Sequence, residues 1–172
     1  PHGEAGTSHY AMTKSLDGLV KLDKYQVFLL TSPASFPLSF AQHPWFVVNR
    51  KGKISRWGVG WRPQAYGASN EWGHLAKDVL PPFQGLRILY FRGSPCWAGS
   101  LMIMIEGGES SIAARMVDFI EQSPQKYPYK DAYSFFGPNS NTYAEWILKR
   151  FPESNMRLPW NAFGKSYAHK RL

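Results

Sequence analysis

The chain has 172 residues, 44% hydrophobic and 16% aromatic side chains, and a formal net charge of +8. This composition supports one folded domain and excludes a disordered chain. The single cysteine, Cys96, excludes an internal disulfide and every multi-cysteine zinc site. The positive charge is compatible with nucleic acid, an anionic membrane surface or an acidic wall polymer, and it selects none of them.

The first residues, Pro1–Asp23, are polar and predict a flexible N-terminal arm, followed by a single domain over residues 24–172. No apolar run approaches the ~20 residues that a membrane-spanning helix needs. Because the sequence begins at Pro1 rather than at methionine, we expect that a targeting segment or anchor could have been removed upstream.

Strands dominate the first half of the predicted domain. Tyr25–Thr31 is rich in β-forming residues and predicts a buried strand. His43–Asn49 and Ile54–Trp61 flank a short glycine-containing turn at Arg50–Lys53, which predicts a β-hairpin. Two more apolar runs predict strands further along the chain, at Leu86–Phe91 and Leu101–Ile105.

Two helices are predicted in the second half. Apolar residues recur at helical spacing within Gly107–Gln122, and Ser110 or Ser111 can cap the start of this helix. Another strand is expected at Tyr129–Phe136.

The second helix is expected over Thr142–Phe151, where Thr142 and Glu145 form a capping-box pattern. The fold class predicted is α+β, an antiparallel sheet with about two main helices.

Metal and thiol chemistry are weakly supported. The histidines are His2, His9, His43, His74 and His169, and none has a metal-ligand spacing or a carboxylate cluster beside it, so we expect no metal and no cofactor.

The Cys96 segment superficially resembles the nucleophile segment of papain, but it precedes a predicted strand rather than a long helix, and only His169 follows it. A structural thiol is the favoured interpretation.

The most informative segment is Gly137-Pro-Asn-Ser-Asn-Thr142, directly before a predicted helix. Asn139, Ser140, Asn141 and Thr142 are all ordinary capping residues, yet a cap needs only one of them. A hydroxyl at a helix N-terminus is also where a nucleophile gains from nearby oxyanion donors.

At these residues the chain resembles a bacterial family known only as domain of unknown function 3750. The similarity runs through His43-Pro-Trp-Phe-Val-Val, Gly58-Val-Gly-Trp61, Tyr127-Pro-Tyr129, Gly137-Pro-Asn-Ser-Asn-Thr-Tyr143, Leu158-Pro and Gly164-Lys165. It covers roughly residues 26–167, and the family implies no activity.

A more distant resemblance is to circularly permuted papain-like folds, including the NlpC type and the lecithin:retinol acyltransferase relatives. Those proteins carry Asn-Cys at the head of a helix and an upstream histidine on a strand. By this resemblance Asn139-Ser140 matches Asn-Cys with serine in place of cysteine, and His43 matches the base. Asn49, Arg56 and His74 are candidates for an orienting third group only by their proximity in sequence.

Two functions therefore remain open. In the first, a hydrolase or acyltransferase uses Ser140 as nucleophile and His43 as base, while Asn139, Asn141 and Thr142 position the substrate. In the second, a catalytically inactive binding module of the same fold holds a small molecule, a peptide, a glycan or an acyl group. Because the basic residues are scattered, nucleic-acid binding is less favoured. The ligand could come from the bacterial cell envelope. For the location of the protein, the periplasm is favoured over the cytoplasm.

Overall fold

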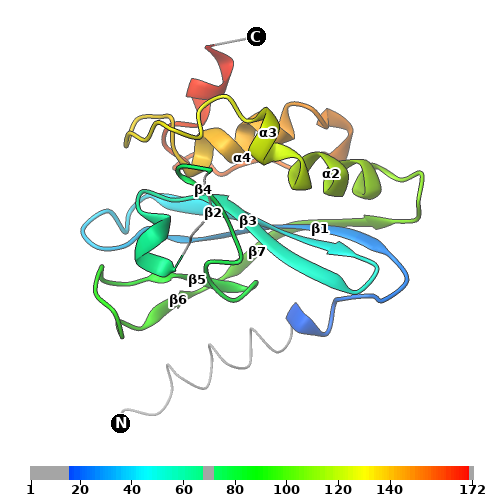
Figure 1. Cartoon of the computed structure of the whole chain (residues 1–172), viewed down its shortest axis with the longest axis horizontal. Helices are drawn as coiled ribbons and strands as arrows, with labels where there is room; N and C mark the ends of the chain where they lie inside the picture. The colour runs from blue at the N-terminus through cyan, green and yellow to red at the C-terminus, as the bar shows by residue number, and fades with distance from the viewer. Residues whose placement is uncertain (1–15, 68–71, 171–172) are drawn as a thin grey trace.

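The computed structural model describes residues 16–67 and 72–170. A five-stranded antiparallel sheet, in the order β4-β3-β2-β1-β7, carries helices on one face and a two-stranded sheet, β5-β6, against the other (Figure 1). The predicted α+β class is thereby confirmed. The strands are β1 Tyr25–Pro33, β2 Gln42–Arg50, β3 Lys53–Val59, β4 Leu75–Lys77, β5 Gln84–Arg87, β6 Cys96–Ala98 and β7 Ser100–Gly107.

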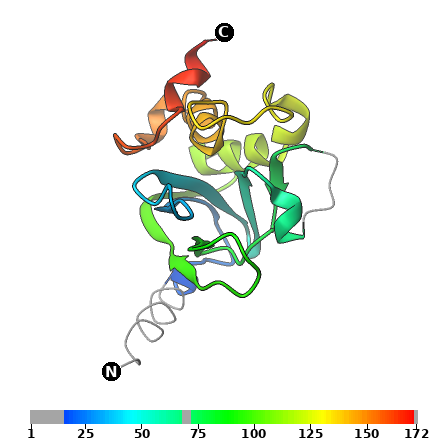
Figure 2. The same ribbon diagram turned by 90° about the vertical axis from the view of Figure 1, so that its left-hand side faces the viewer.

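Most helical segments among the described residues lie in the second half of the chain. The helical segments include η1 Pro63–Tyr66, α2 Ile112–Glu121, α3 Ser123–Lys126, α4 Ser140–Leu148, η2 Pro152–Ser154 and η3 Lys165–His169. Helices α2 and α4 cover the same face of the sheet, as the two views in Figures 1 and 2 show. No helix in the described residues is long and apolar enough to cross a bilayer.

Strand β1 is buried on both faces, which explains its nearly continuous apolar sequence. Val27 and Leu29 pack into the cluster under α2 and α4, whereas Phe28 and Leu30 pack into a second cluster on the opposite face. This division follows from the two-residue side-chain period of a strand. Leu16, which precedes β1, is 8% exposed and belongs to the second cluster.

The predicted hairpin forms between β2 and β3. Lys51 and Gly52 make its turn with φ of 49° and 91°. Both residues are in the left-handed region that two-residue hairpin turns require, and Arg50 pairs with Lys53. The hairpin holds His43 at one end of β2 and Arg56 in the middle of β3, and these positions shape the site described below.

Both predicted helices are present, with one corrected start. Ser111 caps α2 by accepting a hydrogen bond from the Ala114 N–H, at 3.1 Å. Helix α4 begins at Ser140, earlier than predicted, and its capping box joins Asn139 to Thr142 rather than Thr142 to Glu145. The reason is that Asn139 has the extended backbone of a cap residue and a side chain that reaches the first-turn N–H groups.

The strand predicted at Tyr129–Phe136 is wrong, because this segment forms turns and irregular backbone. Tyr129, which is 8% exposed, and Tyr133 pack instead into the core cluster, whereas Phe136 is exposed. The strand predicted at Leu86–Phe91 is only partly present, since β5 ends at Arg87. The N-terminal arm falls largely on residues 1–15, outside the described residues.

Candidate functional site

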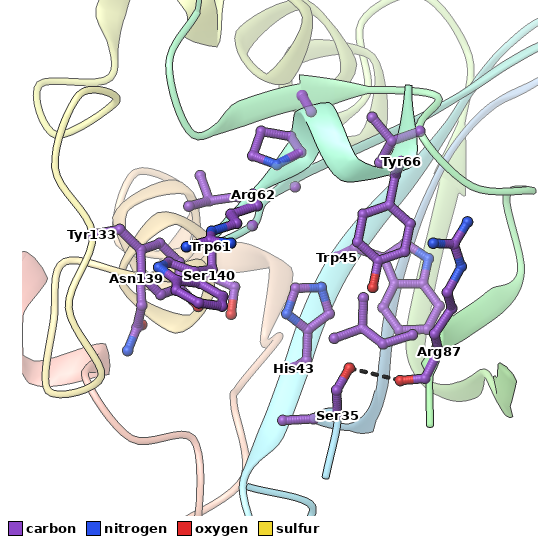
Figure 3. Close-up of a pocket in the computed structure, with 18 of the residues that line it drawn as sticks. Ser35, His43, Trp45, Trp61, Arg62, Tyr66, Arg87, Tyr133, Asn139 and Ser140 are labelled. Carbon is purple, nitrogen blue, oxygen red and sulfur yellow. Dashed lines mark hydrogen bonds between the residues drawn. The ribbon is translucent and has the colours of Figure 1, made fainter. Parts of the chain in front are cut away.

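A cavity of about 200 Å³ lies at the end of the sheet where β2 begins and β3 ends. Its walls come from the β1–β2 loop, the start of β2, the end of β3, η1, the loop after β4, the strand β5 region and the segment before α4. Figure 3 shows His43 between Asn139 and Ser140 on one side and Trp45, Tyr66 and Arg87 on the other. His43 and Ser140, 97 positions apart, thus line one cavity.

His43 is buried, with 8% of its surface exposed, and its ring stacks on Trp45 with centroids 6.2 Å apart. Burial, followed by the positive charge of Arg56, lowers the pKa of His43 to about 3. The imidazole is therefore neutral at physiological pH, the form that accepts a proton. A general base works best with a pKa near the working pH, so His43 is a weak base in this environment.

Ser140 is the first residue of α4 and is 4% exposed. Within the described part of the chain, its hydroxyl makes no side-chain hydrogen bond. The backbone N–H groups of Asn141 and Thr142 already donate to Asn139 Oδ1, at 3.0 and 3.2 Å. These two donors would have to leave the cap before they could stabilise an oxyanion at Ser140.

Asn139 and Thr142 hold the segment before α4 together. The Asn139 amide donates to the carbonyls of Phe135 and Phe163, at 2.7 and 3.0 Å. Thr142 Oγ1 accepts from the Asn139 N–H and donates to the Gly164 carbonyl, at 3.0 and 2.8 Å. Their polar atoms are committed to protein partners, and Thr142 does not line the cavity.

Asn141 differs from its neighbours because half of its amide is unused. Its Nδ2 donates to the carbonyls of Gln42 and Phe163, at 3.0 and 2.9 Å, which fixes the orientation of the amide. The buried Oδ1 has no hydrogen-bond partner among the described residues. An unsatisfied buried acceptor is costly, and this one belongs to a residue of the cavity wall.

Arg56 is the deepest charged group in the cavity wall, with 3% of its surface exposed. Its Nη1 donates to the carbonyl of Pro81 at 2.8 Å and to that of Gln84, and its guanidinium lies 4.2 Å from the centre of the Trp45 ring. Burial lowers the pKa of Arg56 to about 9, so the charge persists at neutral pH. No carboxylate of the described residues forms an ion pair with it.

A second arginine, Arg87, lies on the same side of the cavity as Tyr66 (Figure 3). Its guanidinium stands 4.5 Å from the Tyr66 ring centre, and its carbonyl accepts a hydrogen bond from Ser35 Oγ at 2.6 Å. Burial raises the pKa of Tyr66 above its usual value. The described cavity wall contains arginines but no aspartate, glutamate or lysine.

The remaining candidates lie elsewhere or have other partners. Asn49 donates to the Lys21 carbonyl and to Gln26, both at 2.7 Å, at the far end of β2. His74 Nδ1 lies 3.0 Å from the Gly60 carbonyl. Among the three candidates for an orienting group, only Arg56 lines the cavity, and a cation cannot accept the imidazole proton.

Cys96 lies outside the cavity wall and accepts a hydrogen bond from Gln84 Nε2 at 2.9 Å. Burial raises the pKa of its thiol. No group of three or more His, Cys, Asp or Glu side chains in residues 16–67 and 72–170 is arranged to hold a metal ion.

Comparison with known proteins gives one match. The model of a family described as protein of unknown function, DUF3750, matches residues 24–167, which include the whole sheet and both main helices. The chain belongs to this family. No curated protein and no solved structure gives a significant match.

Several residues of this DUF3750 cavity escaped the sequence analysis. Arg87, Trp61 and Tyr66 line it, and Arg56 was considered only for orienting His43. The loops that carry them are far from His43 and Ser140 along the chain. A sequence signal existed only for Trp61, which ends the Gly58-Val-Gly-Trp motif.

Proposed function

We propose that the DUF3750 domain is a binding module whose cavity holds a small acyl ligand that carries an anionic group. The observation that carries this proposal is the buried guanidinium of Arg56, which forms no ion pair among the described residues. The carboxylate of Asp78 accepts a hydrogen bond from the Arg56 backbone N–H at 2.7 Å and acts on the guanidinium only as a nearby charge. A buried charge is costly unless it is paired. An anionic ligand supplies the missing charge.

The rest of the cavity favours an apolar ligand body. Most of its wall consists of aromatic and aliphatic side chains, including Leu38, Trp61 and Phe135. A peptide or a glycan would need many hydrogen bonds, whereas the unused polar groups here are few, chiefly Ser140 and Asn141 Oδ1. The cavity is smaller than the ~300–1,000 Å³ of typical drug-sized sites, which favours a short acyl chain.

Matched small molecules test the need for negative charge. Hexanoate, hexanol and hexylamine share one apolar chain and differ in the head group, and binding can be followed by calorimetry. We expect hexanoate to bind at least about tenfold more tightly than hexanol, since hydrogen bonds to charged groups are the stronger ones. Equal affinities for the acid and the alcohol, or no binding of any of the three, would contradict the proposal.

An Arg56 variant locates the charge. Arg56→Gln should abolish the preference for hexanoate over hexanol. Arg115→Gln is the matched control, because Arg115 lies on α2 and its side chain is 58% exposed. If Arg56→Gln does not fold, the comparison of the three ligands on the wild-type domain still tests whether binding requires a negative charge.

A second function, hydrolysis or acyl transfer at Ser140, is favoured by one observation. Ser140 and a neutral His43 line the same cavity, and neither side chain makes a hydrogen bond to another described residue. In this reaction Ser140 Oγ attacks the carbonyl carbon of an ester or thioester while His43 takes its proton, and His43 then passes the proton to the leaving alcohol or thiol. Water or an acceptor nucleophile afterwards displaces Ser140 and releases the acyl group. The low pKa of His43 and the occupied N–H groups of the α4 cap make this reaction slower than in an optimised site.

A fluorophosphonate probe separates the two functions. A reactive serine displaces fluoride and becomes covalently labelled, and mass spectrometry identifies the labelled peptide. Labelling of Ser140 that disappears in both Ser140→Ala and His43→Gln would favour the enzyme. Absence of labelling, with hexanoate still bound, would favour the binding module.

A further inference from the structure

Exposed aromatic side chains lie on the loops that contribute to the cavity wall. They come from five loops, residues 34–41, 60–67, 88–95, 133–141 and 157–165, and each has between 47% and 83% of its surface exposed. We call them the aromatic rim: Phe36, Phe40, Trp61, Tyr90, Phe91, Phe136 and Trp160.

Hydrogen bonds and ring contacts join these loops into one surface. The Phe36 N–H donates to the Ile88 carbonyl at 2.8 Å, and the Trp61 and Tyr90 rings meet with centroids 5.9 Å apart. Phe40 packs edge-to-face on Phe135, with centroids 6.3 Å apart.

Asn161 Nδ2 donates to the Phe40 carbonyl at 3.3 Å and so connects the last loop to the others. Figures 1 and 2 show the β1–β2 loop, the loop after β5 and the segment before α4 at the same end of the sheet.

These five loops contain no aspartate or glutamate. They do contain basic residues, Arg62, Arg92, Arg157 and Lys165, and no described carboxylate forms an ion pair with any of them. Four of the ion-paired carboxylates lie around β7 and α2, namely Glu106, Glu109, Asp118 and Glu121. The other three, Asp131, Glu145 and Glu153, lie outside the five loops and pair with Lys130, His169 and Arg115. The surface that the five loops form is therefore apolar and positively charged.

We propose that the aromatic rim docks on the surface of a membrane that contains anionic lipids. Aromatic side chains prefer the boundary between lipid headgroups and acyl chains, and arginine and lysine are attracted to anionic headgroups. An exposed cluster of large apolar side chains on a folded domain also marks an interaction surface. Docking in this way turns these loops of the cavity wall toward the bilayer.

Single-stranded nucleic acid is the main competitor, because it also binds aromatic and basic side chains. Such proteins follow the strand with a continuous basic groove. Here the rings lie on separate loops of the cavity wall rather than along one groove, and Phe36, Phe40, Phe91 and Phe136 have no polar atom in their side chains. A bilayer surface matches this arrangement better. The proposal rests on the loops alone and does not depend on which ligand fills the cavity.

Vesicle sedimentation tests the proposal on the whole chain. One set of vesicles contains phosphatidylcholine alone, and in the other about a third of the lipid is phosphatidylglycerol. We expect at least about tenfold tighter binding to the anionic vesicles, weakened by high salt because exposed charges are screened. Equal binding to both sets, or binding to neither, would overturn the proposal.

Paired variants distinguish vesicle binding by the aromatic rim from non-specific binding through any exposed apolar side chain. Phe136→Ser combined with Trp160→Ser should reduce vesicle binding at least about fivefold, because both apolar rings leave the contact surface. Leu22→Ser is the control, since Leu22 is equally exposed at 78% but lies beside the β2–β3 turn, away from the rim. Both proteins are surface variants, and a thermal melt checks that they remain folded.

A competition experiment addresses the nucleic acid. Single-stranded DNA of mixed sequence should not displace the protein from anionic vesicles at equal phosphate concentration. If DNA binds more tightly than the vesicles and the rim variant loses DNA binding, the surface is a nucleic-acid site and the membrane proposal is wrong.

Discussion

At the scale of single residues, the buried His43 should make the domain acid-sensitive. The unfolded chain binds a proton at the ordinary pKa of 6.5, whereas the folded chain binds it only near 3. Between these values the unfolded state holds more protons, so the free energy of unfolding falls as pH drops, by up to about 1.4 kcal/mol per pH unit.

Urea unfolding at a series of pH values from 7 to 4 measures this slope. His43→Gln should flatten it, since the glutamine side chain does not titrate. His169→Gln is the matched substitution at a histidine on η3 that is 54% exposed. A slope that is equally steep in wild type and His43→Gln would show that His43 is not buried as a neutral ring.

Cys96 provides a second prediction at this scale. Burial raises the pKa of its thiol, so little thiolate exists at neutral pH and iodoacetamide should alkylate Cys96 more slowly than free cysteine. Cys96→Ser should keep both the fold and any ligand binding, because the thiol lies outside the cavity wall. Alkylation faster than that of free cysteine, or loss of function in a folded Cys96→Ser protein, would instead indicate a reactive thiol.

At the scale of elements, the start of α4 depends on a glycine. Gly164 and Gly67 both have φ of +90°, so alanine should strain either position by about 1–2 kcal/mol. Around Gly67 nothing lies within 4 Å of an added Cβ, whereas at Gly164 it would lie 2.8 Å from Cγ of Asn139, the α4 cap. Gly164→Ala should therefore cost about 1–2 kcal/mol more than Gly67→Ala, the range of a lost cap.

Chemical denaturation of Gly164→Ala and Gly67→Ala measures the loss in the free energy of unfolding caused by each substitution. The difference between them isolates the contact with the cap, because the backbone strain is shared. Equal losses would mean that Asn139 moves aside without weakening α4.

The same elements show which structure is predictable from sequence. β1, the β2–β3 hairpin, β7 and α2 were predicted correctly because each has a regular pattern of apolar residues or a definite turn. β4 and β6 have three residues each, too few for any period to appear. The strand prediction at Tyr129–Phe136 failed because aromatic residues are typical of strands. Here they belong to an irregular segment, part of which packs into the core beneath the helices.

The site was predictable in part. His43 and Ser140 were proposed as a pair because each lies near the start of an element within a recognisable motif, and they line one cavity, while their functional role stays a prediction. The unpaired charge of Arg56 was not visible, since it depends on which groups of distant loops fail to reach it. The aromatic rim was missed for the same reason: its rings come together only after the five loops have been placed in space.

At the scale of the whole molecule, the second hydrophobic cluster extends the domain toward the N-terminus. Leu16 precedes the predicted domain start yet is 8% exposed against Phe28, Phe83 and their neighbours. Leu16→Ala should destabilise the domain by about 2–4 kcal/mol, the cost of removing a buried leucine side chain.

Leu22→Ala is the control for Leu16, because Leu22 is 78% exposed and should change stability by less than about 0.5 kcal/mol. Thermal and urea unfolding of the two variants provide the comparison. If Leu16→Ala is as stable as Leu22→Ala, the domain begins at β1, as the sequence predicted.

The order of strands in the sheet also bears on how the chain folds. β2 and β3 are joined by a two-residue turn, whereas β1 pairs with β7 across more than 70 residues, as in the pair Leu29 and Ile103. Local pairings close small loops and form quickly, while distant ones must first overcome a larger loss of chain entropy. The hairpin carrying His43 and Arg56 therefore forms ahead of the β1–β7 pairing. The cavity wall also includes Ser140, Asn141 and Phe163, so the cavity closes only when the last part of the chain docks, and a nascent chain that stops before α4 carries most of the wall residues but leaves one side of the cavity open.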